Sequence, residues 1–136
     1  MRALILALLP VAAIGAEPVT CPPELPAGSV AVHAPAGWAV FPPDRVTLTG
    51  AGMMAGPPES MTDLAPTNAD RTVVTWTFTD RDEKWLTCSY GSRDVRISKR
   101  LDDAVTECRV HYVKSKFGSG IERVTVACIK PKSTHQ

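Results

Sequence analysis

The sequence predicts a mainly β domain built from antiparallel strands and stapled by two disulfides. Three observations support this: an apolar N-terminal leader, four cysteines that all follow it, and alternating apolar and polar residues from Thr72 onward. In an oxidising compartment, such cysteines form disulfides. We therefore expect a small sandwich or open barrel with about five strands in the C-terminal half.

The first sixteen residues have the pattern of a secretory signal peptide. Arg2 supplies the positive start, residues 3–14 form an apolar run, and Gly15-Ala16 offers small residues for cleavage. The run is shorter than the ~18 apolar residues of a membrane-spanning helix. We expect cleavage near Ala16, a single mature domain over 17–136 in the periplasm or outside the cell, and no transmembrane anchor.

Charge and proline divide the mature chain into two unlike halves. Residues 17–70 hold one basic and six acidic residues, whereas residues 71–136 hold thirteen basic and eight acidic residues. Of the twelve prolines, only Pro131 follows Pro66. The first half has too few periodic apolar residues to fold alone. We therefore expect residues 17–70 to wrap irregularly around a β-meander formed by residues 71–131.

Five runs of period-two alternation predict the strands of that meander. They cover residues 72–79, 85–90, 95–101, 105–113 and 121–130. Registers that keep the apolar side chains on one face pair Val74 with Tyr90, Tyr90 with Val95, and Val110 with Val126. These pairings predict that each run lies beside the next one along the chain.

The first half shows weaker strand signals. Short strand candidates lie at 29–33, 38–41 and 46–49, each close to prolines that limit pairing. Residues 50–66 contain three glycines and three prolines, together with Met53 and Met54, and read as a loop.

The four cysteines allow three disulfide connectivities. The predicted last hairpin places Cys108 opposite Cys128, where the Cα atoms are close enough for a bridge. The remaining pair, Cys21–Cys88, would tie the N-terminal segment to the sheet. A zinc site at Cys108-x-x-His111 is disfavoured, because an odd offset on a strand sends the two side chains to opposite faces. We expect no metal and no cofactor.

Several motifs resemble those of an uncharacterised family of small secreted proteins of Gram-negative bacteria. They are Cys21-Pro22, Gly56-Pro57-Pro58-Glu59, Leu64 with Pro66, Trp76, Trp85-x-x-Cys88-x-Tyr90 and Cys108-x-Val110-x-Tyr112. Leu101 is followed here by Asp102, where members of that family often carry proline. The resemblance implies a periplasmic disulfide-bonded domain and assigns no activity.

The motifs expected of an enzyme are missing from the sequence. There is no Cys-x-x-Cys and no Gly-x-Ser-x-Gly, and only His33, His111 and His135 could act as a histidine base. The acidic pair Asp102-Asp103 lies in a predicted turn, where carboxylates serve local hydrogen bonds. The near-zero net charge and the expected compartment argue against a nucleic-acid partner.

The polar face of the last strands is the candidate contact surface for another protein with an acidic surface. Trp85 has odd parity relative to the apolar residues of its strand, so we expect it to point outward among arginines, as at a binding hot spot. The predicted contact residues are Trp85, Arg96, Arg100, Arg109, His111 and Arg123.

Compartment, size and charge together favour an exported non-enzymatic binding protein. We expect it to act as an inhibitor or immunity protein that occludes a cell-wall-directed enzyme or toxin. One alternative is an accessory subunit of an envelope assembly, which would use an exposed edge strand or the Met53-Met54 loop. Another is a small periplasmic hydrolase that depends on His33 or His111.

Overall fold

The computed structural model describes residues 19–42, 44–118 and 120–131, so the predicted signal peptide lies outside the described range. Within that range the chain forms strands and a single turn of 3-10 helix. The elements are β1 (Val19–Cys21), β2 (Glu24–Leu25), β3 (Val46–Met54), η1 (Pro58–Ser60), β4 (Asn68–Ala69), β5 (Val73–Thr77), β6 (Trp85–Tyr90), β7 (Val95–Arg100), β8 (Glu107–Lys114) and β9 (Ile121–Ile129). The prediction of a mainly β protein is confirmed.

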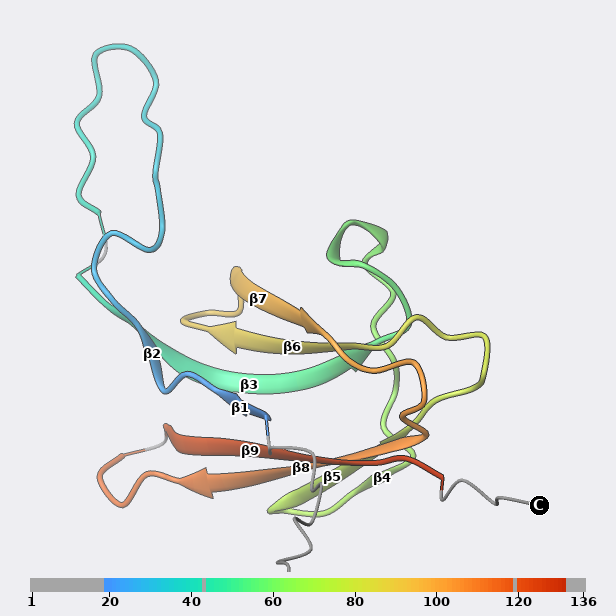
Figure 1. The fold of residues 1–136 in the computed structure, drawn as a ribbon. Coiled ribbons are helices and arrows are strands. Elements are labelled where there is room, and N and C mark those ends of the chain that lie inside the picture. Colours follow the sequence, from blue (N-terminus) through green and yellow to red (C-terminus); the bar gives the residue numbers. More distant parts are fainter. Residues whose placement is uncertain (1–18, 43, 119, 132–136) are drawn as a thin grey trace, which may run out of the picture.

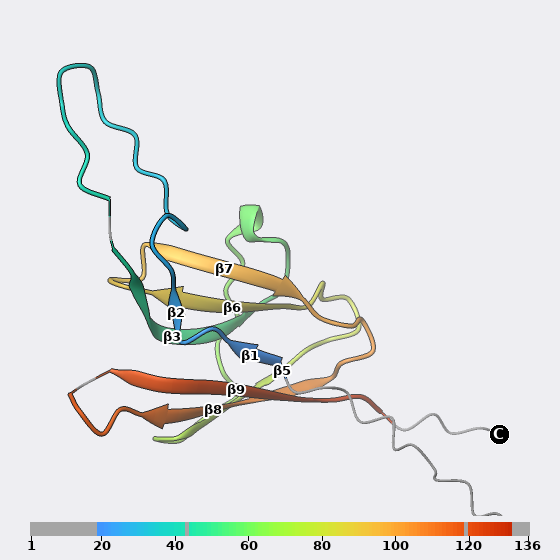
Figure 2. The same cartoon turned by 60° about the vertical axis from the view of Figure 1, so that its left-hand side comes forward.

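The strands form two antiparallel sheets that face each other and do not close into a barrel (Figures 1 and 2). The five-stranded sheet has the order β1-β9-β8-β5-β4, and the four-stranded sheet has the order β2-β3-β6-β7. Each sheet contributes one face to a shared hydrophobic core. The fold is therefore a small two-layer sandwich.

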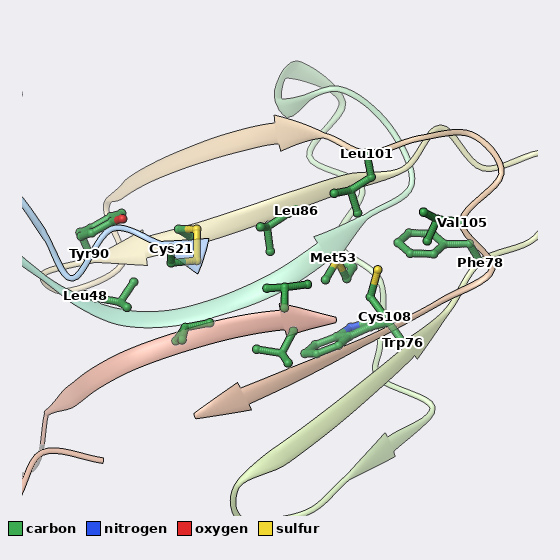
Figure 3. Packing of buried hydrophobic residues seen from close by; sticks show 14 residues of the cluster. Cys21, Leu48, Met53, Trp76, Phe78, Leu86, Tyr90, Leu101, Val105 and Cys108 are labelled. Atoms are coloured by element: carbon green, nitrogen blue, oxygen red, sulfur yellow. A yellow bond between two sulfur atoms is a disulfide. The ribbon is translucent and has the colours of Figure 1, made fainter. Parts of the chain in front are cut away.

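The core consists of alternate residues from the facing strands, as Figure 3 shows. On β6 they are Leu86, Cys88 and Tyr90, and they lie across from Val110 on β8 and Val124 on β9. Full burial of a side chain of this size contributes roughly 2 kcal/mol to folding. The period-two alternation thus identified correctly which residues of these strands face inward.

Hydrogen bonds from three aromatic side chains tie the core to neighbouring backbone. The Tyr112 hydroxyl on β8 donates to the Ala51 carbonyl oxygen on β3 at 2.8 Å, and so connects the two sheets. The Tyr90 hydroxyl donates to the Pro22 carbonyl at 2.9 Å, and the Trp76 indole N–H donates to the Leu64 carbonyl at 3.0 Å. Trp76 and Tyr90 are buried and Tyr112 is half-buried, and each of their polar groups has a partner, which avoids the desolvation cost of an unpaired donor.

Both predicted disulfides are present. Cys108 and Cys128 lie opposite each other on β8 and β9, with 4.1 Å between their Cα atoms. Cys21–Cys88 joins β1 of the five-stranded sheet to β6 of the four-stranded sheet, with 5.7 Å between the Cα atoms. The second bridge therefore links the two layers of the sandwich.

The predicted pairing between the first two runs of the meander is wrong. Val74 pairs with Val110 on β8, and Tyr90 pairs with Leu48 on β3. The chain crosses from one sheet to the other between β5 and β6 and crosses back between β7 and β8, so the predicted adjacency of runs 95–101 and 105–113 is also wrong. Alternation of apolar and polar residues predicts which face of a strand is buried, but it does not predict which strand pairs with it. The predicted registers of β6 with β7 and of β8 with β9 are confirmed. Short turns join the strands of each pair, and this is why the local pattern was sufficient to predict them.

The predicted loop over residues 50–66 begins too early. Strand β3 continues to Met54, and Met53 and Met54 are each only 1% exposed. Met53 enters the core, while the segment that follows β3 folds back over Met54, with the Leu64 N–H donating to the Met53 carbonyl at 2.9 Å. An exposed Met53-Met54 loop therefore does not exist. The strands predicted at 29–33 and 38–41 are also wrong, since those residues form an exposed loop.

Removing the disulfide between the sheets should destabilise the protein more than removing the one within a sheet. Cys21–Cys88 spans 67 residues and Cys108–Cys128 spans 20. The entropy of loop closure assigns roughly 4 and roughly 3 kcal/mol to loops of these lengths. Urea unfolding of the Cys21→Ala/Cys88→Ala and Cys108→Ala/Cys128→Ala variants measures both losses. An equal or larger loss in the second variant would contradict this ranking.

Stability should fall in alkaline solution because of two tyrosines. Burial raises the pKa of Tyr90 and of Tyr112 above the ordinary 10.0. Below pH 10 the two tyrosines contribute fully to the free energy of unfolding. This contribution is lost as the pH rises through their folded-state pKa, because the unfolded chain releases phenolic protons that the folded chain retains. The Tyr90→Phe/Tyr112→Phe variant should show a shallower fall. Urea unfolding at about pH 8 and about pH 11 tests this, and parallel declines would refute it.

Candidate functional site

The outer face of the four-stranded sheet contains a hollow of about 620 Å³. Its floor includes Gly50 and Gly52 of β3, where an added Cβ would meet no atom within 4 Å. Thr87 and Ser89 of β6 lie directly across from these glycines. Two glycines on one face of a strand leave the backbone uncovered, and this creates the space.

Arg96 on β7 borders this hollow, together with Asp63 from the segment that follows η1. The Arg96 Nη1 atom lies 3.1 Å from Asp63 Oδ1 and 3.2 Å from Oδ2, and its Nη2 atom is 3.6 Å from the Met61 sulfur. The guanidinium thus attaches the 55–66 segment to the sheet. The hollow therefore combines a polar backbone floor with hydroxyl groups and an arginine that already has an acidic partner.

Trp85 and Arg100 lie on the same outer face and share one carboxylate. The Trp85 indole N–H donates to Glu83 Oε1 at 2.9 Å, and the Arg100 guanidinium donates to the same oxygen at 2.5 Å. Arg100 Nη2 is also 2.8 Å from Asp103 Oδ1. The side chain of Trp85 is half-buried, so it supports this network as well as facing outward.

The other three predicted contact residues lie on the outer face of the five-stranded sheet. His111 pairs with Thr125, and Arg123 pairs with Val113, in the β8–β9 register. Arg109 Nε is 2.8 Å from Glu107 Oε1 on the same strand. The prediction that all five basic residues share one face is therefore wrong. Because β7 and β8 belong to different sheets of the sandwich, their outward side chains point in opposite directions.

The chemistry required by the alternatives is not assembled in the described part of the chain. Cys108 is bonded to Cys128 and faces inward, whereas His111 is exposed on the opposite face of the sheet. His33 lies in an exposed loop, and no serine or threonine hydroxyl bonds to either imidazole among residues 19–42, 44–118 and 120–131. Within those ranges, no three His, Cys, Asp or Glu side chains converge as metal ligands.

The exposed loop between β2 and β3 was not identified from the sequence. It rises away from both sheets in Figures 1 and 2 and carries Trp38 and Phe41, which are 76% and 95% exposed. The sequence signal for it is Pro-Ala-Gly, which occurs twice, at 26–28 and 35–37. Pro followed by Gly two residues later is typical of a tight turn. The repeat indicates two turns, at 26–29 and 35–38, beside the strands predicted at 29–33 and 38–41.

The described residues contain no helix long and apolar enough to cross a membrane. Fold and surface together define a small disulfide-linked β-sandwich whose outer faces offer hydrogen-bonding and charged groups for recognition. The family model of the type VI secretion system Tli immunity protein matches residues 43–129. This match covers more than half of the chain and includes every strand from β3 to β9, so the chain belongs to the Tli immunity protein family.

Searches among curated proteins and among solved structures gave no match. The family match gives a function to a chain whose sequence motifs alone resembled a family without one. The expectation of an immunity protein is confirmed by it.

Proposed function

We propose that this chain is a periplasmic immunity protein that neutralises a toxin by binding it, without catalysing a reaction. The family match over residues 43–129 carries the proposal, because it spans nearly all of both sheets. The two disulfides support an oxidising compartment. Stable occlusion requires a rigid surface, and a sandwich cross-linked between its layers supplies one.

Deleting the gene should make a strain sensitive to its own parent. A toxin delivered by neighbouring cells would find no immunity protein, so the deletion strain should lose in co-culture on a solid surface. The full chain should restore survival, whereas a version without residues 2–16 should not, because it would stay in the cytosol. Counts of surviving cells after contact measure both effects.

A parent that lacks its type VI secretion apparatus is the control, and the deletion strain should survive beside it. Attackers that each lack one secreted toxin then identify the toxin concerned. Equal survival of the deletion strain and the wild type beside the intact parent would refute the immunity function. Rescue by the version lacking residues 2–16 would refute the periplasmic site of action.

For the contact surface, we propose the outer face of the four-stranded sheet around the hollow. The predicted contact set is divided between two opposite faces, and a single globular toxin surface can cover one of them. The face with Trp85, Arg96 and Arg100 also offers a recess of about 620 Å³. A recess admits protruding side chains of a partner, and buried side chains dominate binding energy.

Arg96 gives this surface its preference for an acidic group. Its guanidinium lies beside the hollow and makes two hydrogen bonds to Asp63, which is itself exposed. A carboxylate of the toxin that enters the recess would replace Asp63 as the partner of Arg96. Exposed ion pairs contribute only about 0–1 kcal/mol, so the exchange has a small cost.

Filling the hollow should abolish tight binding while the fold stays intact. In Gly50→Phe, the ring would occupy the recess, and the site has room because an added Cβ meets nothing within 4 Å. Ala127→Phe is the matched control, since Ala127 is exposed on the outer face of the other sheet, across from Arg109. Calorimetry with the toxin identified in co-culture should show a loss of roughly tenfold or more for the first variant and little change for the second.

A second pair of variants tests the charge. Arg96→Gln should flatten the salt dependence of toxin binding, whereas Arg123→Gln on the opposite face should leave it unchanged. Urea midpoints close to that of the wild type would show that every variant is folded. If Ala127→Phe and Arg123→Gln change toxin binding more than Gly50→Phe and Arg96→Gln do, the contact surface lies on the five-stranded sheet instead.

A further inference from the structure

The loop between β2 and β3, here called the arm and described at residues 26–42 and 44–45, presents apolar side chains to solvent. Every residue from Ala31 to Pro42 is exposed. Among them Phe41 is 95% exposed and Trp38 is 76% exposed, and Val32 and Val40 are also exposed. These side chains contribute no burial to the core. Large exposed apolar side chains gathered on one projecting segment mark an interaction site.

The arm is stiffened by two turns of the same kind. The Ser29 N–H donates to the Pro26 carbonyl at 3.1 Å, and the Trp38 N–H donates to the Pro35 carbonyl at 3.1 Å. Gly28 and Gly37 occupy the same place in the two turns with φ of +84° and +87°, a conformation that glycine adopts without strain. A segment held in one shape loses less conformational entropy on binding.

The base of the arm is fixed to the sandwich. Leu25 pairs with Val46 where β2 meets β3, and the Glu24 carboxylate lies 3.4 Å from Arg45 across the two ends of the arm. Cys21 is three residues before Glu24 and is bonded to Cys88. The arm therefore starts and ends on the cross-linked part of the fold and projects away from both sheets (Figure 1).

Charge argues for an apolar protein recess as the binding partner of the arm. From Leu25 to Pro43 the sequence contains no Asp, Glu, Lys or Arg, and the flanking residues Glu24, Asp44 and Arg45 sum to one negative charge. A segment that binds anionic membrane surfaces needs basic residues beside its apolar ones, and the arm lacks them. Tryptophan and a neighbouring aromatic residue are the usual anchors of protein interfaces.

Residues 26–42 of the arm lie outside the segment that the family model matches, which begins at residue 43. The match begins just before β3 and leaves out β1, β2 and nearly all of the arm, so the arm is not part of what the match covers. An element of this kind suits recognition of one particular partner. Building on the immunity function proposed above, we propose that the arm inserts Trp38 and Phe41 into an apolar recess of the toxin and determines which toxin is bound.

The test uses the full mature chain and the toxin identified by co-culture. Trp38→Ala and Phe41→Ala should each weaken binding by roughly tenfold or more, and the double variant should weaken it further. Phe117→Ala is the matched control, because Phe117 is 94% exposed in the loop between β8 and β9, and it should bind like the wild type. All variants should share one urea midpoint, because the exchanged side chains are exposed.

Each other result would overturn the proposal. Binding of the double variant with unchanged affinity would show that the arm is dispensable. Loss of a concentration-dependent dimer in the double variant, with toxin affinity unchanged, would assign the arm to a second copy of the chain. Loss of binding to vesicles of phosphatidylcholine and phosphatidylglycerol, with toxin affinity unchanged, would assign it to a membrane.

The failure of the immunity function would be visible without any arm variant. In that case the wild-type chain itself would neither protect the deletion strain nor bind a toxin, and the arm proposal would fall with it. A wild-type chain that protects and binds, beside a double variant that does so equally well, would overturn the arm proposal alone.

Discussion

The sandwich depends on a short N-terminal segment that belongs to both of its layers. Val19–Cys21 extends the five-stranded sheet along β9, and Glu24–Leu25 pairs with β3 in the four-stranded sheet. Cys21–Cys88 makes this crossing covalent, and the Tyr90 hydroxyl bonds to the Pro22 carbonyl inside it. Because Cys21 is bonded to β6 while β1 pairs with β9, separation of the sheets requires either the β1–β9 pairing or the disulfide to break, and this opposes sliding of one sheet over the other.

This arrangement gives the molecule two independent outer faces and one projection. The face of the four-stranded sheet is hollowed where Gly50 and Gly52 expose backbone, while the opposite face presents Arg109 and Arg123. The arm emerges between β2 and β3, next to the cross-linked crossing. We propose the recess and the apolar projection, both carried by the four-stranded sheet, as two complementary kinds of contact with the toxin.

The local sequence pattern was enough to predict much of the fold, but it did not predict which strands pair when they lie far apart in the sequence. The hairpins β6–β7 and β8–β9 and the disulfide Cys108–Cys128 agree with the sequence analysis, since short turns hold those registers. Cys21–Cys88 agrees with it as the pair of cysteines that remains. The second half of β3, beyond the strand predicted at 46–49, was missed because glycines interrupt its alternation. The predicted neighbour of β5 was wrong because the alternation indicates which face of a strand is buried and does not indicate its partner strand. The same error merged Arg96 and Arg109 into one surface.

The sequence by itself determined the β class, the inward or outward direction of the side chains along β5 to β9, and the pairing of Cys108 with Cys128, which left Cys21 for Cys88. These follow from the period of an extended backbone and from turns a few residues long. Only the tertiary structure decided which strands share a sheet, where the hollow lies and that the arm stays exposed. Those features depend on which distant segments bury their apolar surface against one another. A local sequence pattern does not determine this, because many pairings of the segments would bury similar amounts of apolar surface.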